Sequence, residues 1–441
     1  MDLIDRVHAE RPEPRQRSAH GGAGWGNGQS PLRVCHLGKF YPPASGGIET
    51  HLRTLAQAQA RLGLAVTVMC VNHLYGGEQD VTWRAMAATA NREEADGLVR
   101  LVRLGKHASL ARLDFCPGLP WRLARMGPTN CDLLHLHVPN PTMVLALFAC
   151  RPRVPWVITY HSDVVRQRTL LRLQRPFENW VFRRARAILA TSPAYAQGSD
   201  YLQHFTDKVA VVPFGIDLDA FLNPGMGARR QAEEFRQAHG EPLWLTVGRL
   251  VYYKGLHNAI RALARVPGKL MIVGDGPLHR ELERLAELEG VADRVVWQKR
   301  LSPEELVGAY HAATALWFPS NARSEAFGFV QVEAMACGTP VINTAIPGSG
   351  VAWVSRHGES GLTVPVNDPA ALAAAAKRLL AEPGLRQQLA RNARHRVEQV
   401  FDHLLMARRS VDLYHQVLGR PTPNGSDRVN GVGLSVETNG L

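Results

Sequence analysis

Short apolar runs recur along most of the chain, separated by turns and by stretches with helical spacing. Runs of this kind that alternate with amphipathic stretches are typical of βαβ units and a parallel sheet. The first series lies at 32–37, 65–71, 99–104, 133–137, 156–160, 187–191 and 209–212. This series predicts one doubly wound domain over residues 31–213.

A second series of apolar runs follows a polar segment that is rich in Pro and Gly. Its strands are expected at 243–247, 270–273, 295–297, 315–318, 340–342 and 362–364. Helices are expected between them, beginning near Gly255, Pro277, Ser302, Glu325 and Asp368. The pattern predicts an α/β fold with a second doubly wound domain over 243–395, and it predicts that the polar segment 214–242 is an interdomain linker.

The two ends of the chain differ from these domains. Residues 1–30 predict a flexible leader, and the Gly- and Asn-rich residues 420–441 predict a disordered tail. Residues 396–419 predict a C-terminal helix, and this helix could return to pack on the N-terminal domain. No segment has the apolar length of a signal peptide or of a membrane-spanning helix, so we expect a cytoplasmic protein.

Composition and charge narrow the class of protein. With 441 residues, 45% of them hydrophobic and 20% charged, the chain is long enough for two globular domains and is not of a disordered or fibrous class. Eight of its twelve net positive charges lie in 31–220, which suits nucleic acid, an anionic membrane or phosphorylated substrates. The six cysteines form no C-x-x-C pair, which favours a reducing compartment without structural zinc.

Parallel sheets bind ligands at the carboxyl ends of their strands, so the candidate chemistry lies in strand-to-helix loops. The first such loop ends in Gly46-Gly47 before a helix, where backbone N–H groups can approach a phosphate or a sugar. A plain tight turn is the alternative. The loop after 243–247 carries Arg249 and Lys254, two cations that suit a diphosphate unless they are simply solvated.

Two further loops carry carboxylates and a histidine. Glu325 and Glu333 are eight residues apart around a glycine, and a helix starting near Phe327 would point its amides into a cleft. A carboxylate at Glu333, on an otherwise apolar helix, needs partners such as ribose hydroxyls or a core salt bridge. His161 follows the strand 156–160 and could carry a proton, bind phosphate or orient a group.

Metal chemistry is weakly indicated. The histidines of the H-x-H sequence at 135–137 would suggest a metal only if further ligands lay close in space, so no metal is assigned. The D-x-D sequence at 217–219 is better explained by a helix N-cap or a linker.

The ordered set of loops resembles the retaining glycosyltransferases with the GT-B fold, and specifically glycosyltransferase family 4. The resemblance spans about residues 31–418. It is carried by six motifs in order: G-G-I-E at 46–49, T-Y-H-S-D at 159–163, V-P-F-G-I-D at 212–217, V-G-R with K-G at 247–255, V-G-D-G-P at 273–277 and E-x7-E-A-M-A-C-G-T-P-V at 325–341.

The resemblance implies a role for each matching residue. Catalytic roles fall to His161, Arg249, Lys254 and Glu325. Donor and nucleotide binding falls to Gly47, Arg249, Lys254, Arg300, Leu301, Phe327, Gly328, Phe329 and Glu333. Gly46 and Asp163 would lie on the acceptor side. Arg249 and Lys254 would hold the diphosphate, Glu333 would hold the ribose, and His161 would touch the donor sugar or phosphate.

The resemblance also implies metal-independent transfer with retention, by front-face attack and without a cofactor. The loop at 159–168 resembles that of bacterial mannosyl- and rhamnosyltransferases of lipopolysaccharide and exopolysaccharide synthesis, many of which use GDP-mannose. Expected partners are a nucleotide sugar and a lipid-linked or polysaccharide acceptor, and nucleic acid is not expected. The segment 166–186, with seven arginines, predicts either an interfacial helix at the inner face of the cytoplasmic membrane or a solvated helix.

Two other readings of the chain stay open at this point. One is another nucleotide-sugar enzyme on the same fold, such as a UDP-sugar transferase, an epimerase or a glycogen-synthase-like elongator. The other is a catalytically silent protein that acts in the assembly of a polysaccharide complex.

Overall fold

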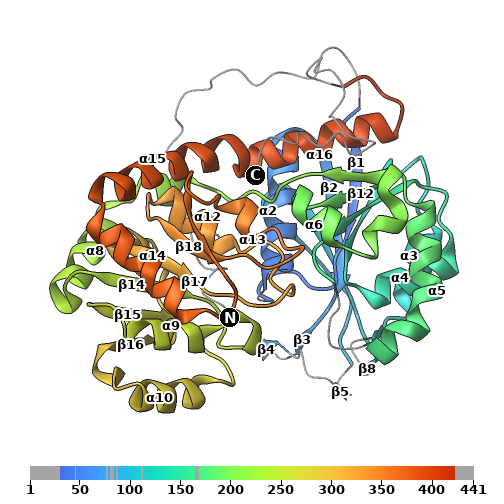
Figure 1. Ribbon diagram of the computed structural model, residues 1–441. Coiled ribbons are helices and arrows are strands. Elements are labelled where there is room, and N and C mark those ends of the chain that lie inside the picture. Colours follow the sequence, from blue (N-terminus) through green and yellow to red (C-terminus); the bar gives the residue numbers. More distant parts are fainter. Residues whose placement is uncertain are drawn as a thin grey trace.

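The computed structural model describes residues 30–44, 46–75, 78–79, 84–85, 88–110, 113–163 and 168–422. The predicted leader and tail therefore lie outside the described residues, apart from residue 30 and residues 420–422. The described chain forms two α/β domains, with the N-terminal one on the right of Figure 1 and the C-terminal one on the left.

The N-terminal domain is built on an eight-stranded sheet in the order β13-β12-β11-β10-β1-β2-β7-β6. Neighbouring strands are parallel except at the edge, where β6 runs antiparallel to β7. The central strands are buried on both faces, which explains their continuous apolar sequences. The strands are β1 (Arg33–Leu37), β2 (Ala65–Val71), β6 (Arg92–Asp96), β7 (Val99–Leu104), β10 (Leu133–Val138), β11 (Trp156–Tyr160), β12 (Ala187–Ala190) and β13 (Val209–Val211).

Helices cover both faces of this sheet (Figure 1). They are α2 (Gly47–Arg61), α3 (Gly118–Ala124), α4 (Pro141–Cys150), α5 (Arg168–Arg184), α6 (Pro193–Gly198) and the 3₁₀ segment Leu202–Lys208. Short antiparallel pieces lie beside the sheet: β3 (Leu74–Tyr75), β4 (Glu78–Gln79), β5 (Arg84–Ala85), β8 (Ala108–Leu110) and β9 (Leu113–Phe115). The apolar pattern does not predict these five strands, because they are short. It also does not predict the edge strand β6, because its sequence, REEAD, is polar.

The C-terminal domain has a six-stranded parallel sheet in the order β16-β15-β14-β17-β18-β19. Its strands are β14 (Leu243–Val247), β15 (Lys269–Val273), β16 (Val295–Gln298), β17 (Ala315–Phe318), β18 (Val341–Thr344) and β19 (Gly361–Val364). Its helices include α9 (Leu256–Leu263), α10 (His279–Leu288), α11 (Pro303–Ala312), α12 (Phe329–Ala336), α13 (Val351–Val354) and α14 (Pro369–Ala381), with 3₁₀ segments at Tyr252–Lys254 and Ala292–Arg294.

The segment 214–242 differs from the predicted linker. It contains α7 (Asp219–Leu222) and α8 (Met226–His239), and its apolar side chains pack into the core of the C-terminal domain. On α8 these side chains recur at helical spacing between charged residues: Ala228, Ala232 and Phe235. The polar composition of the segment concealed this buried face. Ahead of α7, an Asp217 carboxylate oxygen accepts a hydrogen bond from the Asp219 N–H at 3.2 Å.

The last two helices run across the top of both domains in Figure 1. Helix α15 (Pro383–Val400) belongs to the C-terminal domain, and α16 (His403–Val417) packs against α2 of the N-terminal domain. The chain therefore crosses between the domains twice. The two crossings are hydrogen-bonded to each other, because the Ile216 N–H donates to the Phe401 carbonyl at 2.9 Å and the His403 N–H donates to the Ile216 carbonyl at 3.1 Å.

Candidate functional site

A cavity of about 580 Å³ lies between the two domains, at the carboxyl ends of their strands. It is walled by loops that follow β1 and β11 in one domain and β14, β15, β16 and β17 in the other. Ten of the thirteen predicted site residues line it: Gly46, Gly47, His161, Arg249, Lys254, Arg300, Glu325, Phe327, Gly328 and Phe329. The fold thus gathers residues that are up to 284 positions apart in the sequence, from Gly46 to Val330.

Three predicted residues are not among the described residues that line the cavity. Leu301 is buried in the core of the C-terminal domain. Glu333 is 1% exposed on α12, behind the cavity wall. Asp163 accepts hydrogen bonds from the hydroxyl groups of Tyr160 and Tyr195 at 2.6 and 3.0 Å. It also forms an ion pair across the domain interface with Arg323 at 2.8 Å, so its observed contacts hold the two domains together.

Helix α12 presents its N-terminus to the cavity. It begins at Phe329, two residues later than predicted, because Gly328 has left-handed backbone angles with φ of 80°. A Cβ atom at this position would lie 2.6 Å from the ring of Phe318, so the turn requires glycine. The residues of the first turn, Phe329 and Val330, line the cavity, and the free N–H groups of a first turn attract anions.

The cavity wall carries more positive than negative charge. Its cations are Arg249, Lys254, Lys299 and Arg300, and its carboxylates are Asp275 and Glu325. Lys254 Nζ lies 2.6 Å from a carboxylate oxygen of Glu325, which also accepts a hydrogen bond from the Ser320 hydroxyl at 3.1 Å. Arg249 is exposed and has no ion-pair partner among the described residues. An anionic ligand would thus meet Arg249 directly and would compete with Glu325 for Lys254.

Glu333 is held by one polar neighbour inside the C-terminal domain. Its carboxylate accepts a hydrogen bond from the Tyr310 hydroxyl at 2.6 Å. Burial raises the pKa of Glu333 to about 7, although the Tyr310 hydrogen bond and the charge of Lys254 act in the opposite direction. The sequence predicted that Glu333 would contact ribose hydroxyls or form a core salt bridge. The partner observed in the structure is instead the hydroxyl group of Tyr310.

Phe214 joins the two sides of the cavity and is not among the residues predicted from the sequence. Its ring stacks on that of Phe329 with centroids 5.5 Å apart and planes inclined by 5°. It also lies 5.0 Å from the His161 ring. Phe214 sits inside the V-P-F-G-I-D motif, and that motif was the signal that could have identified it. Lys299, next to the predicted Arg300, is a second lining residue that the prediction missed.

Five buried histidines lie together, and one of them, His161, lines the cavity: His36, His51, His135, His137 and His161. Burial lowers the pKa of each, to about 4 for His36 and to about 3 for His161, so all five are neutral at pH 7. Two sets of three have ring nitrogens within 4.8 Å of one another, a proximity that the H-x-H pattern alone could not reveal. Hydrogen bonds already use several of these nitrogens, and the absence of a metal stays a prediction.

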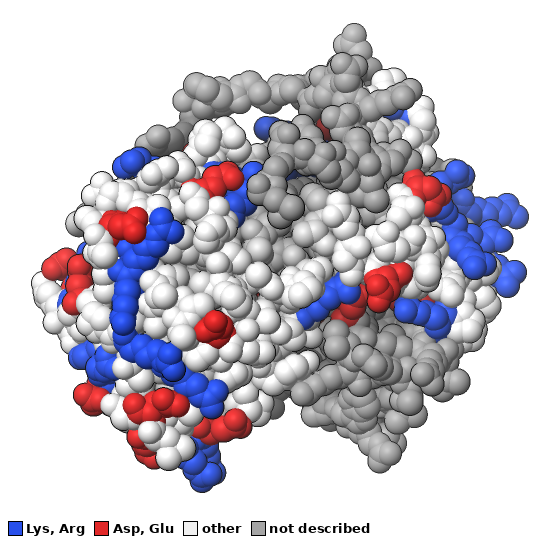
Figure 2. Space-filling view, in the orientation of Figure 1, with Lys and Arg blue, Asp and Glu red and all other residues white. Residues whose placement is uncertain are grey.

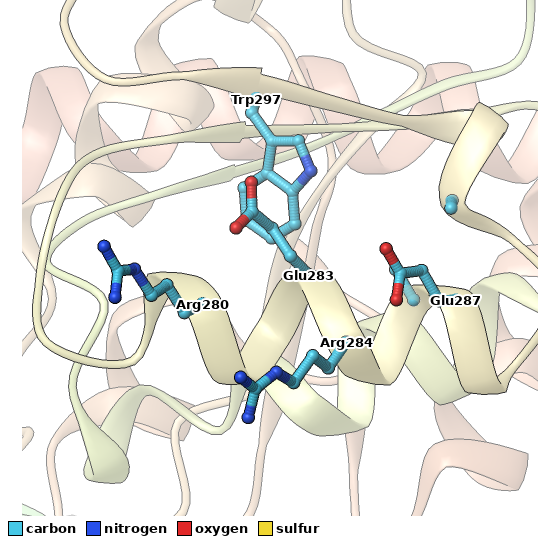
Figure 3. Close-up of a pocket in the computed structure, with 7 residues that line it drawn as sticks. Arg280, Glu283, Arg284, Glu287 and Trp297 are labelled. Atoms are coloured by element: carbon cyan, nitrogen blue, oxygen red, sulfur yellow. The ribbon is translucent and has the colours of Figure 1, made fainter.

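A second hollow lies on the outer side of the C-terminal domain, along α10 (Figure 3). It is lined by Arg280, Glu283, Arg284, Glu287 and Trp297, and in Figure 3 the two arginines reach away from Trp297. Because cations and carboxylates alternate along this helix, the hollow offers no concentrated charge to an anion. None of the predicted site residues lines it.

Comparison with known proteins assigns this polypeptide to a protein family. A family model described as "Glycosyltransferase Family 4" matches residues 45–220, and one described as "Glycosyl transferases group 1" matches residues 228–396. Each matched range falls on one of the two Rossmann-like domains. The chain therefore belongs to glycosyltransferase family 4, and it has the GT-B fold of two such domains facing each other across a cleft.

Individual relatives agree with this assignment. The D-rhamnosyltransferase WbpZ of Pseudomonas aeruginosa is 37% identical over 272 residues, which cover 62% of this chain and 70% of that protein. The O-antigen chain mannosyltransferase C of Escherichia coli is 30% identical over 395 residues, which cover 88% of this chain and 99% of that protein. Among solved structures, sucrose-phosphate synthase from Thermosynechococcus elongatus is 26% identical, with a TM-score of 0.69 over 88% of this chain and 99% of its own.

Proposed function

We propose that this glycosyltransferase transfers a hexose from a nucleotide sugar to a lipid-linked or polysaccharide acceptor in cell-surface glycan synthesis, with GDP-mannose as the donor. The observation that carries the proposal is the cavity where Arg249, Lys254 and the first turn of α12 meet. Two cations and a helix N-terminus suit a diphosphate. Mannose is chosen because the relatives include an O-antigen chain mannosyltransferase and a D-rhamnosyltransferase.

The proposed reaction breaks the bond between the anomeric carbon and the diphosphate oxygen, and it joins that carbon to an acceptor hydroxyl oxygen. Arg249 and Lys254 stabilise the charge that develops on the leaving diphosphate, so the reaction needs no metal ion. The acceptor proton passes to a leaving phosphate oxygen on the face of attack, and the anomeric configuration is retained. Glu325, which is paired with Lys254, positions the sugar and does not act as a nucleophile.

The donor is tested by thermal shift and by slow hydrolysis. Purified protein is incubated with GDP-mannose, UDP-glucose, UDP-N-acetylglucosamine or dTDP-rhamnose, with EDTA and with magnesium. A ligand that binds the native state raises the melting temperature. We expect stabilisation by GDP-mannose and release of GDP at the same rate under both conditions. A response only to UDP-glucose would replace the proposed donor, and a requirement for magnesium would overturn the metal-independent mechanism.

A matched pair of variants connects this result to the cavity. Arg249→Ala removes a cation from the cavity wall, whereas Arg261→Ala removes one from α9, where it pairs with Glu289 at 3.4 Å outside the cavity. We expect the first variant alone to lose the thermal shift. With an acceptor in hand, proton NMR of the new glycosidic bond then reports whether the configuration is retained.

We further propose that the N-terminal domain contacts an anionic membrane from the cytoplasmic side, where a lipid-linked acceptor would be reached. None of the described helices is both long enough and apolar enough to cross a bilayer. The N-terminal domain does expose Leu98, Phe115 and Trp121, at 73%, 64% and 56%, and the Arg125 guanidinium lies 3.5 Å from the Trp121 ring. Figure 2 shows Lys and Arg side chains gathered at the outer edge of this domain.

Vesicle sedimentation tests the membrane contact. We expect the protein to pellet with vesicles that contain phosphatidylglycerol and not with vesicles of phosphatidylcholine alone, and Trp121→Ala to weaken the binding. Met226→Ala, at a residue 89% exposed in the other domain, is the matched control. Equal binding to both vesicles, or none, would contradict the proposal.

A further inference from the structure

A chain of hydrogen bonds runs from the C-terminal helix to the cavity through three elements of the N-terminal domain. Gln59 on α2 bonds to His36 on β1 at 2.8 Å, His36 Nδ1 lies 3.0 Å from His137 Nε2 on β10, and His137 Nδ1 lies 3.1 Å from His161 Nε2 after β11. All four residues of this chain of hydrogen bonds are buried, and His36 and Gln59 are 0% exposed. At its far end the chain reaches a residue that lines the cavity.

The direction of this chain is set at its start. The Ser410 hydroxyl donates its single proton to the Ala407 carbonyl at 2.7 Å, so its oxygen has to accept the hydrogen bond that joins it to Gln59 at 2.8 Å. The amide nitrogen of Gln59 therefore faces α16, where it also bonds to the Tyr414 hydroxyl at 2.9 Å. This orientation leaves the amide oxygen of Gln59 facing His36, and that oxygen can only accept.

Each neutral histidine passes the direction on. An imidazole that donates from one nitrogen accepts at the other, and burial keeps these rings neutral. His36 donates from Nε2 to Gln59 and so accepts at Nδ1. His137 then donates from Nε2 and accepts at Nδ1, which makes His161 a donor from Nε2. The other ring nitrogen of His161, Nδ1, takes no part in this chain of hydrogen bonds and therefore carries a lone pair. Among the described residues, Nδ1 has no hydrogen-bond partner.

We propose that Gln59, His36 and His137 are positioning residues for the cavity histidine: they hold it in the Nε2–H tautomer, so that its Nδ1 accepts a hydrogen bond from a hydroxyl group of the donor sugar. This inference rests on the proposed function for the identity of the ligand. A lone pair repels a phosphate oxygen, which also has only lone pairs to offer. The family resemblance left two contacts open for His161, the donor sugar and the donor phosphate. The tautomer that this chain of hydrogen bonds sets favours the sugar.

The tautomer can be measured without any donor. Two-bond ¹H–¹⁵N correlation spectra of protein labelled in its histidines distinguish Nε2–H from Nδ1–H, and His161→Gln identifies the signals by deleting them. We expect the Nε2–H form in the wild-type protein. The Nδ1–H form, which a reversed chain would produce, overturns the proposal whatever the donor is.

Three variants test what sets the tautomer. His137→Phe keeps an aromatic ring but removes the acceptor, so His161 should change to Nδ1–H, whereas His137→Asn retains an acceptor oxygen and should restore Nε2–H. His51→Phe is the matched control, because His51 is also buried and its ring lies 5.7 Å from that of His137, but neither of its ring nitrogens has a hydrogen-bond partner among the described residues. If His137→Phe does not fold, Gln59→Met replaces it and should yield a mixture of tautomers. An unchanged tautomer in the folded variant overturns the proposal.

Binding and turnover distinguish the sugar contact from a structural role. With GDP-mannose we expect His137→Phe to lower the hydrolysis rate constant about tenfold or more, because a hydrogen bond to the sugar is lost, and His137→Asn to recover most of it. The dissociation constant for GDP, which lacks the transferred hexose and its hydroxyl groups, should stay within about twofold. A parallel loss of GDP affinity would assign His161 to phosphate and overturn the sugar contact. If GDP-mannose is not a substrate, the proposed donor fails while the tautomer result still stands.

Discussion

Lys254 and Glu325 form an ion pair on the wall of the cavity. Each charge is largely withdrawn from water and is compensated by the other at 2.6 Å. In the function that we propose, a diphosphate would offer Lys254 a second partner of higher charge, so its binding would exchange one ion pair for another instead of uncovering a solvated cation. This exchange would release Glu325 toward the sugar at the moment when the donor arrives.

A paired substitution separates catalysis from stability at this position. Lys254→Ala is expected to lower turnover about 10²- to 10³-fold, because the leaving group loses a cation. It should also destabilise the fold by roughly 1–3 kcal/mol, since the Glu325 carboxylate is only 8% exposed and loses its counter-charge. Adding Glu325→Gln should recover stability in urea unfolding but not turnover. Recovery of both would show that Lys254 acts only through the fold.

Glu333 predicts a pH dependence of nucleotide binding. Its pKa of about 7 means that the carboxylate, the form that accepts two ribose hydroxyls, becomes the major form only as the pH rises above 7. If Glu333 holds the ribose, we expect GDP to bind about five- to tenfold more tightly at pH 8 than at pH 6, measured by calorimetry. The phosphate of GDP also titrates, so the comparison is with Glu333→Gln, which should flatten the part of the slope due to Glu333. Identical slopes in both proteins would remove Glu333 from the nucleotide site.

Helix α12 depends on the turn that precedes it. Gly328→Ala places a Cβ atom 2.6 Å from Phe318 in a left-handed conformation, so we expect a loss of roughly 1–3 kcal/mol of stability in urea unfolding. The shifted helix start should also weaken GDP binding. Gly384→Ala, whose added Cβ meets no atom within 4 Å at the start of α15, is the control and should be close to neutral. Equal effects at both glycines would contradict the role of the turn.

The elements that the sequence predicts are those with a strong local pattern. The strands at 156–160 and 243–247 match their predicted bounds because buried parallel strands are continuously apolar. Helix α8 was missed because charged residues separate its buried positions and because nearby Pro and Gly indicated a linker. The glycines and charges of the site could be selected as residue types, but Phe214 and Gln59 matter through neighbours that are distant in sequence, and no local pattern carries that information.

The buried histidines predict that the folded protein loses stability in acid. Their folded pKa values lie below the ordinary 6.5, so the unfolded chain binds protons that the folded chain does not. Stability is therefore complete above about pH 6.5 and is lost as the pH falls toward 4, by about 1.4 kcal/mol per pH unit for each such histidine. We expect urea midpoints to fall between pH 7 and pH 5, and His135→Phe to reduce that slope. A flat profile over this range would contradict neutral burial.

The two crossings between the domains, bonded to each other at Ile216, Phe401 and His403, also bear on how such enzymes can be recombined. The C-terminal domain is one uninterrupted insert between two points that are hydrogen-bonded to each other, while α16, the last helix described, returns to the N-terminal domain. A chimera that exchanges everything after residue 213 would leave α2 facing a foreign helix. One that exchanges only 214–402 keeps that contact and the start of the hydrogen-bond chain to His161, so the whole C-terminal domain can be transplanted as a single segment.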